Sequence, residues 1–334
     1  MELATAKQVH TNPVYSNYFA DPFVWKVGEV YYAIGTGEPE AEGRTIGKIF
    51  PVLQSSDFYT WQPASSALER PDPELGANFW APEVAAAEDK FYLYYSVGHG
   101  DKYHQLRVGV SDNAPGPFRD TGKSLLSPES CAFAIDPHPF RDDDGKWYLF
   151  YARDFLDTQG GNRAGTGLMV APLRAMTELE SEGQMILRPR HDWQRFQSNR
   201  PKHGGIWDWH TVEGPFVTKH DGRYYCFFSA GRWENDTYGV DYAVADEPTG
   251  PYSHAAGENG PRVLRTVPGH VLGPGHNSII TGPDGETDYI IYHAWDKDMK
   301  VRRMFIDKLS WTADGPRCDG PTWGRHEPVV APQI

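Results

Sequence analysis

Short apolar runs separated by polar turns recur along the chain, and pairs of such runs predict β-hairpins. The clearest pair joins the apolar run 134–140 to the aromatic run 147–151 through a charged turn that contains Asp144-Gly145. Glycine accepts the positive φ that a tight turn requires, so this pattern favours two antiparallel strands. Four other segments repeat the arrangement, and their first strands begin near residues 21, 82, 213 and 276.

The spacing of these repeats predicts the architecture. Successive starts at 21, 82, 136, 213 and 276 are 61, 54, 77 and 63 residues apart. Each interval has room for about one four-stranded sheet with its loops, slightly more than the usual propeller blade. The sequence therefore predicts an all-β fold, a five-bladed β-propeller, in which residues 1–334 form a single domain.

Composition and charge narrow the classes of partner. Aromatic residues are 13% of the chain, and 34 glycines and 27 prolines favour short strands and turns over helices. The formal net charge of −13 argues against nucleic acid and anionic membranes, because phosphate binding needs a basic face. An acidic chain rich in aromatic rings suits a neutral polyol, whose faces stack on rings and whose hydroxyl groups bind carboxylates.

The remaining sequence signals concern cysteines and targeting. The three cysteines, Cys131, Cys226 and Cys318, have neither the spacing of a disulfide framework nor that of a metal site, and Cys226 is expected to be a buried small hydrophobe. Residues 1–20 show no charged start followed by an apolar core, and no run of ~18 apolar residues occurs. We therefore expect a cytoplasmic protein, or an extracellular one if a leader has been removed.

Radial repetition predicts where chemistry would lie. The inner strand of each blade starts near the central axis, so residues at equivalent positions of different blades converge on one pocket. The residues expected to converge are Asp21, Asp136, Glu213 and His276, with Glu83 or its neighbours from the second blade. Three carboxylates and a histidine around one axial cavity indicate a catalytic role for these residues more than a purely structural one.

Five short motifs at blade spacing also carry a family resemblance. They are Asp21-Pro22, Trp80-Ala81-Pro82-Glu83, Ile135-Asp136-Pro137, Val212-Glu213-Gly214-Pro215 and Gly275-His276-Asn277-Ser278. In this order they resemble glycoside hydrolase family 43, five-bladed propellers that act on plant pentosans. The segment 292–296, followed by Arg302-Arg303, is similar to members that remove terminal arabinofuranose or xylose.

The resemblance implies a role for each carboxylate. Inverting glycoside hydrolysis needs a carboxylate that activates water on one face of the sugar and an acid that protonates the leaving oxygen. The family pattern makes Asp21 the general base and Glu213 the general acid. Asp136 would orient Glu213 and raise its pKa by like charge. Structural alternatives remain open, since Asp21 could merely open a strand and Asp136 could be a turn residue.

Other candidates are less specific. The matching histidine of the family often holds a calcium or sodium ion on the axis, which would make His276 the ligand of a water-rich calcium site without a chemically essential role. Arg303 could clamp a sugar hydroxyl or the base carboxylate, or be a solvated cation. Phe23, Trp80 and Trp209 are candidates for the sugar platform, or else belong to the core of the blades.

Together these expectations describe an exo-acting, inverting hydrolase that removes terminal α-L-arabinofuranosyl or β-D-xylosyl residues from small oligosaccharides. Exo action follows if the long loops predicted at 153–165 and 189–209 wall off one side of the axial pit. The alternatives are a non-catalytic sugar-binding propeller, a protein-interaction scaffold, a retaining hydrolase and an endo-acting arabinanase of the same fold.

Overall fold

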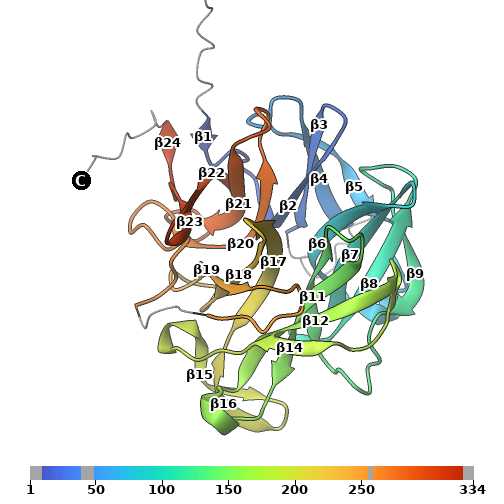
Figure 1. Ribbon diagram of the computed structural model, residues 1–334, viewed down its shortest axis with the longest axis vertical. Coiled ribbons are helices and arrows are strands. Elements are labelled where there is room, and N and C mark those ends of the chain that lie inside the picture. The colour runs from blue at the N-terminus through green and yellow to red at the C-terminus, as the bar shows by residue number, and fades with distance from the viewer. Residues whose placement is uncertain (1–9, 39–48, 255–258, 326–334) are drawn as a thin grey trace, which may run out of the picture.

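The computed structural model describes residues 10–38, 49–254 and 259–325, and in these ranges strands arranged as sheets around a common centre make up nearly all of the regular structure (Figure 1). The helical elements of the described residues are three single 3₁₀ turns, at Pro73–Leu75, Gln159–Gly161 and Asp192–Gln194. Over the same ranges, no helix has the length and apolar character that crossing a membrane requires.

Three sheets have the four strands expected of a propeller blade, each in chain order. The first holds β2 (Ala20–Val27), β3 (Val30–Thr36), β4 (Ile49–Ser55) and β5 (Gln62–Leu68). The second holds β6 (Asn78–Ala87), β7 (Lys90–His99), β8 (Lys102–Ser111) and β9 (Arg119–Ser124). The fifth holds β20 (Leu272–Thr281), β21 (Asp288–Trp295), β22 (Arg302–Thr312) and β23 (Gly315–Cys318).

The third and fourth sheets depart from this pattern. The third joins seven strands: β10 (Ala134–Arg141), β11 (Trp147–Phe155), β12 (Gly165–Ala175), β13 (Glu178–Leu179), β14 (Gln184–Leu187), β15 (Arg195–Lys202) and β16 (Gly205–His210). Within the described ranges, the fourth has three: β17 (Val212–His220), β18 (Arg223–Ala230) and β19 (Gly239–Ala245). The all-β propeller arrangement is therefore as predicted. The expected four strands in every repeat are not found, because the third and fourth sheets have seven and three.

The edge of the fourth sheet is held by a buried carboxylate. Asp241 on β19 is fully buried, and its oxygens accept hydrogen bonds from Arg262 Nε at 2.6 Å and from the ring of His254 at 3.1 Å. Single bridges join Val240 to Leu264 and Val244 to Ser253 on the same edge. These contacts satisfy backbone groups that a fourth strand would otherwise pair.

The segment 189–209 is the main error in the predicted loops. Most of it forms the β15–β16 hairpin, which projects from the lower edge of the molecule in Figure 1. Two register shifts interrupt this hairpin, and its sequence is polar, so the alternation typical of a strand is weak. The predicted loop at 153–165 likewise overlaps the end of β11 and the 3₁₀ turn at Gln159–Gly161.

The ends of the described chain close the ring. The short strands β1 (Thr11–Asn12) and β24 (Gly324–Arg325) pair with each other. The segment after β1 then runs along the start of β22, where the Val14 and Phe19 amides donate to the carbonyls of Met304 and Arg302. The segment that follows β1 therefore lies beside the fifth sheet, while β1 and β24 form a separate two-stranded sheet.

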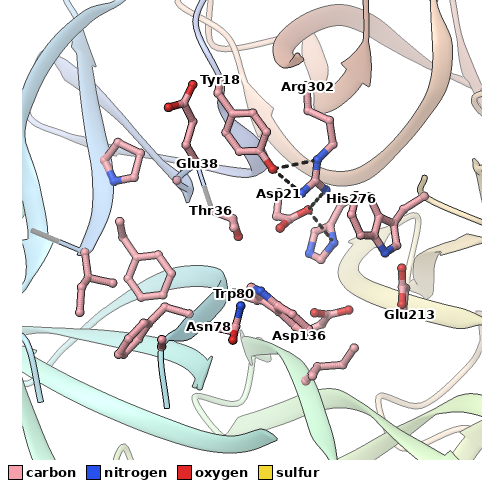
Figure 2. A pocket seen from close by; sticks show the side chains of 18 of the residues that line it. Tyr18, Asp21, Thr36, Glu38, Asn78, Trp80, Asp136, Glu213, His276 and Arg302 are labelled. Atoms are coloured by element: carbon pink, nitrogen blue, oxygen red, sulfur yellow. Dashed lines mark hydrogen bonds and ion pairs between the residues drawn. The ribbon is translucent and has the colours of Figure 1, made fainter. Parts of the chain in front are cut away.

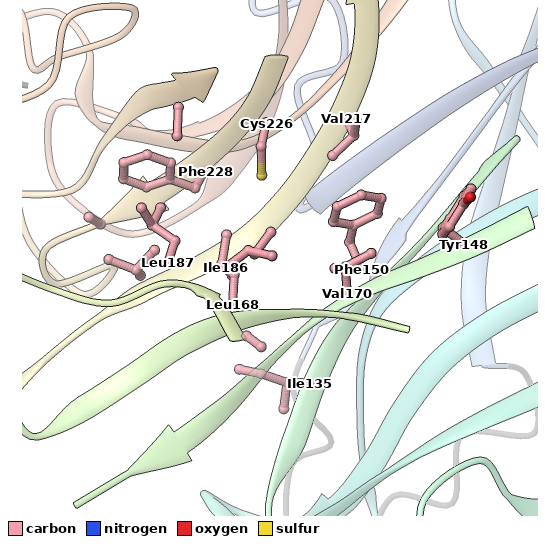
Figure 3. Packing of buried hydrophobic residues seen from close by; sticks show 14 of the residues in the cluster. Ile135, Tyr148, Phe150, Leu168, Val170, Ile186, Leu187, Val217, Cys226 and Phe228 are labelled. Atoms are coloured by element: carbon pink, nitrogen blue, oxygen red, sulfur yellow. The ribbon is translucent and has the colours of Figure 1, made fainter. Parts of the chain in front are cut away.

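Apolar side chains fill the spaces between neighbouring sheets. Between the third and fourth sheets, the core includes Phe150, Leu168, Val217, Cys226 and Phe228, each at most 3% exposed (Figure 3). Burial of one such large side chain stabilises the fold by roughly 1.5–3 kcal/mol. The prediction that Cys226 is a buried hydrophobe is confirmed.

All inner strands share one backbone feature near their start, a residue with left-handed φ inside a β-bulge. These residues are Asp21, Ala81, Asp136, Gly214 and His276, with φ between 47° and 57°. A bulge re-aims the side chains beside it, which explains its place at the end of the strands that faces the cavity described below. The predicted repeat starts at 82 and 213 are therefore one residue away from the true equivalents, 81 and 214.

Candidate active site

A cavity of about 600 Å³ opens where the inner strands begin (Figure 2). Side chains from all five inner strands line it: Asp21 on β2, Trp80 on β6, Asp136 on β10, Glu213 on β17 and His276 on β20. The cavity continues over the first two sheets, along Ile49–Pro51 and Ala77–Phe79. The convergence of the predicted carboxylates and histidine on one cavity is thus observed, although Glu83 is not among the lining residues.

Glu83 instead forms a buried bridge below the cavity. Its Oε2 lies 2.7 Å from Nδ1 of His138, and Nε2 of His138 accepts a hydrogen bond from the Val217 amide. Because Nε2 accepts, the ring proton lies on Nδ1 and is donated to Glu83. This relay ties the second, third and fourth sheets together and leaves Glu83 no direct access to a ligand.

Two predicted sugar platforms do not face the cavity. Trp209 on β16 is 1% exposed and packs against the cations of Lys202 and Arg200, so its interpretation as a platform is wrong. Phe23 on β2 stacks on Trp25 with 6.2 Å between ring centroids and packs against two apolar clusters. Both rings belong to the packing of the sheets.

Trp80, the third predicted platform, does line the cavity. The imidazole of His104 stacks beneath it, with ring centroids 3.8 Å apart and an angle of 22°. His104 is 1% exposed, and burial lowers its pKa to about 4, so the ring is neutral at physiological pH. One face of the indole is therefore covered by protein, which leaves the other as the face available to a ligand.

The arginine beside Asp21 is Arg302, and not the predicted Arg303. Arg302 Nη1 lies 3.6 Å from Asp21 Oδ1, and Arg302 Nη2 donates to the Tyr18 hydroxyl at 2.6 Å (Figure 2). Successive residues of a strand point to opposite faces, so Arg303 turns away. It lies in a second, smaller cavity of about 320 Å³, with Asp296 Oδ2 3.4 Å from its Nη2.

Asp21 is held as a carboxylate by its neighbours. Its own burial would raise its pKa, but His276, with Nδ1 at 3.4 Å, and Arg302 outweigh burial and keep that pKa below its usual range. Burial lowers the pKa of His276, so Arg302 is the cation that persists at neutral pH. The Asp21 amide donates to Nδ1 of His293, whose ring is likewise kept neutral by burial, with its pKa lowered to about 4.

Glu213 has the opposite tendency. Burial raises its pKa to about 7, even though the Tyr238 hydroxyl donates a hydrogen bond to its Oε1 at 2.7 Å and favours the charged form. Asp136 is also buried, and burial followed by the charge of Glu213 raises its pKa well above the usual value. The Gly214 amide donates to Asp136 Oδ2 at 2.9 Å. The main cause of the raised Glu213 pKa is thus burial, and the like charge that adds to it is Asp21, whereas the prediction assigned this effect to Asp136.

The arrangement offers one ionised carboxylate, Asp21, and two carboxyls with raised pKa values, Glu213 and Asp136, all lining the same cavity. Two titratable groups whose environments push their pKa values apart are the usual basis for a base and an acid at one site. The profile that describes glycosyl hydrolases family 43 matches residues 10–316. The chain belongs to this family.

Individual relatives differ in what they act on. The chain is 29% identical to "Beta-D-galactofuranosidase xynD" of Aspergillus niger over 84% of the chain and 75% of that protein. It is 27% identical to "Extracellular endo-alpha-(1->5)-L-arabinanase 1" of Bacillus subtilis over 89% of the chain and 86% of that protein. A thermostable family-43 glycoside hydrolase superposes with a TM-score of 0.79 at 29% identity, covering 96% of this chain and 98% of that one.

Some residues of this family 43 site were absent from the sequence prediction. Tyr238 precedes β19 in an irregular segment, and Tyr18 precedes β2, so neither occupies a repeated position. Trp233 and Trp295 stack at 6.2 Å, and the Arg302 guanidinium lies 4.4 Å from the Trp233 ring. The one available signal was the aromatic content of these loops, which does not indicate which ring reaches the cavity.

A metal site at His276 has only partial support. Among the described residues, no group of three or more histidine, cysteine, aspartate or glutamate side chains could hold a metal ion. Beside His276, however, both side-chain polar atoms of Asn277 are buried without a hydrogen-bond partner. Nε2 of His293 is also buried without a partner, but it carries the ring proton, because Nδ1 accepts from the Asp21 amide, and it therefore offers a cation no lone pair. The amide oxygen of Asn277 and the imidazole of His276 are acceptable ligands for a calcium ion whose other ligands are waters. These donors therefore fit a weak calcium site, and not one in which the protein supplies most of the ligands.

Proposed function

We propose that this family 43 chain is an exo-acting, inverting glycoside hydrolase that removes terminal α-L-arabinofuranosyl or β-D-xylosyl residues from pentosan oligosaccharides. The observation that carries the proposal is the contrast between Asp21, held ionised beside Arg302, and Glu213, whose pKa is raised to about 7. A water activated by Asp21 would attack the anomeric carbon while Glu213 protonates the leaving oxygen. This contrast also argues against a sugar-binding module without catalysis, which needs no such pair.

The geometry required by inversion is a further part of the proposal. The carboxyl groups of Asp21 and Glu213 would lie roughly 6.5–9.5 Å apart, so that a water fits between the base and the sugar. Asp136 would orient Glu213, and Trp80 would stack on the sugar. Phe23, Trp209 and Arg303 have no part in this mechanism.

Exo action draws support from the β15–β16 hairpin. Arg200 on β15 forms an ion pair at 2.8 Å with Asp101 in the β7–β8 turn, which fixes the hairpin against the second sheet. The charge of Arg200 also acts on Glu213, so the hairpin stands on the side of the acid. It would limit how far the substrate extends there.

Endo action on arabinan is the second candidate, because the cavity extends over the first two sheets as well as the catalytic centre. The similarity to the Bacillus subtilis arabinanase points the same way. A panel of nitrophenyl α-L-arabinofuranoside, β-D-xyloside and β-D-galactofuranoside, with linear arabinan in parallel, separates the candidates. Release of monosaccharide without an early fall in viscosity supports exo action; a rapid viscosity fall before monosaccharide is detected contradicts it.

One broader inference, on the domain, and one outcome, on the location of the protein, accompany this proposal. We infer that the five large sheets are five blades of one catalytic domain. The expectation of a cytoplasmic protein gains no support from the relatives, since the Bacillus subtilis protein is named extracellular.

A calcium ion near His276 is proposed as a structural and electrostatic aid. Exhaustive chelation is expected to lower the melting temperature by a few degrees, because one ligand-linked site contributes only a few kcal/mol to folding. Calcium, but not magnesium, should restore it, since magnesium holds its water more tightly. Asn277→Ala should weaken the calcium response without removing His276. An unchanged melting temperature after chelation would return His276 to a purely structural role.

A further inference from the structure

A repeated hydrogen bond links the inner strand of three of the five sheets to the sheet before it. On the second strand of every sheet, one residue pairs with the residue just before the left-handed one. We call this the partner position, and it is occupied by Thr36, Ser96, Ala152, Ser229 and His293 in the first to fifth sheets.

At three junctions, the amide of the left-handed residue donates to the partner position of the preceding sheet. The contacts run from the Ala81 amide to Thr36 Oγ1 (2.9 Å), from the His276 amide to Ser229 Oγ (2.7 Å) and from the Asp21 amide to His293 Nδ1 (3.0 Å). Each one satisfies a backbone N–H that the bulge has removed from the sheet.

Two junctions depart from this pattern. Between the second and third sheets, the Ser96 hydroxyl lies 3.4 Å from Nδ1 of His104. Between the third and fourth sheets, the departure lies beside Glu213, the proposed acid. The partner position there is Ala152, which has no acceptor atom and is fully buried. The Gly214 amide, next in sequence to Glu213, therefore donates to Asp136 Oδ2 at 2.9 Å. Glycine at 214 leaves room for the His276 ring, because a Cβ there would lie only 3.2 Å from its Nδ1.

The Gly214 amide thus donates to Asp136 where three equivalent amides donate to a side chain at the partner position, and this affects which of the two carboxyls, Asp136 or Glu213, holds a proton. Two buried carboxyls that interact strongly share their protons as a pair, so one proton can reside on either residue. A hydrogen bond from an N–H stabilises a carboxylate, and Asp136 receives one from the backbone. Glu213 has only the Tyr238 hydroxyl, which can either donate to a carboxylate or accept from a carboxylic acid.

We propose that Ala152 is a positioning residue: by offering no acceptor, it turns the Gly214 amide toward Asp136 and thereby places the shared proton on Glu213. This inference rests on the proposed roles of the two carboxyls. Other charges face the pair from β2, β6, β15 and β22. Asp21 raises the pKa of both carboxyls, Glu83, bonded to His138, raises that of Asp136, and Arg200 and Arg302 lower that of Glu213. The hydrogen bond from Gly214 to Asp136 acts against these charges, because it lowers the pKa of Asp136.

Ala152→Ser tests the inference, because it restores the hydroxyl present at Thr36 and Ser229. The serine would accept the Gly214 N–H, Asp136 would lose a charge-assisted bond, and part of the shared proton would move to Asp136. We expect hydrolysis of a pentose disaccharide, which needs the acid, to fall by roughly tenfold. Hydrolysis of a dinitrophenyl pentoside should stay unchanged, because its leaving group departs without protonation.

Two control variants separate this effect from a packing defect. Ala152→Gly also lacks an acceptor and should keep the wild-type ratio of the two rates. Ala171→Ser buries a hydroxyl at another fully buried alanine, in β12, and should match the stability loss of Ala152→Ser without changing the ratio. Equal losses on both substrates for Ala152→Ser, or a changed ratio for Ala152→Gly, would contradict the proposal.

Carboxyl NMR gives a readout that does not depend on turnover. With ¹³C at the carboxyl carbons of aspartate and glutamate, Glu213 should carry the proton at pH 6 in the wild type, and Asp136 should take up part of it in Ala152→Ser. A proton already on Asp136 in the wild type overturns the inference. An inactive wild-type protein in which Glu213 still holds the proton would instead refute the proposed function alone.

Discussion

Glu213→Ala is expected to lower hydrolysis of xylobiose or arabinobiose by roughly 10²–10⁴-fold, the usual contribution of a general acid. The same variant should hydrolyse dinitrophenyl pentosides at close to the wild-type rate. Protonation matters most when the leaving oxygen is basic, and a dinitrophenolate leaves without help. Steady-state kcat/KM on both substrates measures the difference directly.

The pH profile of the wild type gives an independent check on the same residue. Because the pKa of Glu213 is raised to about 7, the acid is protonated below that pH and loses its proton above it. The rate on the disaccharide should therefore fall on the alkaline side from about pH 7, by tenfold for each further pH unit. The dinitrophenyl substrate should lack this limb.

Glu83→Gln is the matched control for Glu213→Ala. Glu83 is also a buried carboxyl near the start of an inner strand, but it is bonded to His138 below the cavity. Its removal should cost stability and leave the ratio of the two substrates as in the wild type. If Glu213→Ala loses both activities equally, the general acid lies on another strand.

The sequence predicted that Asp21, Asp136 and His276 line one cavity because the signal for their position is local. Asp21, Asp136 and His276 each stand just before an apolar run, a polar turn and a second apolar run. This order of segments can be recognised from one sequence alone. The exact alignment of the repeats could not be predicted to within one residue. A β-bulge inserts one extra residue into a strand, and side chains alternate between faces with a period of two, so the sequence pattern does not show which residue is shifted. The second and fourth repeats were therefore aligned one residue away from Ala81 and Gly214.

The same period explains the choice between two arginines. Arg302 and Arg303 are adjacent and chemically identical, and a strand sends one to each face. Only the pairing of β21 with β22, in which Arg302 stands opposite Trp295, shows which one reaches Asp21. Tyr238 was beyond prediction for another reason, since it lies in an irregular segment and contacts Glu213 through tertiary packing alone.

Aromatic content was a poor guide to the sugar platform. Trp80 and Trp209 both stand near the start or end of strands, yet one lines the cavity and the other is 1% exposed. The difference lies in what covers each ring. His104 covers one face of Trp80, whereas cationic side chains of the β15–β16 hairpin cover Trp209. That hairpin was predicted to be a loop, so its packing could not enter the prediction.

Asp21→Ala should lower hydrolysis of the disaccharide and of the dinitrophenyl pentoside alike, by roughly 10²–10⁴-fold, because both reactions need the same activated water. This equal loss distinguishes the base from the acid. The variant also leaves the Arg302 guanidinium, which is 8% exposed, without its carboxylate partner, so its melting temperature should fall as well. Asp21→Asn preserves the size of the side chain and removes only the base, and it should show the same loss of activity with better packing. Proton NMR of the first sugar released by the wild type completes the assignment: the inverted anomer is expected if Asp21 activates water, and the retained anomer would make Asp21 a nucleophile instead.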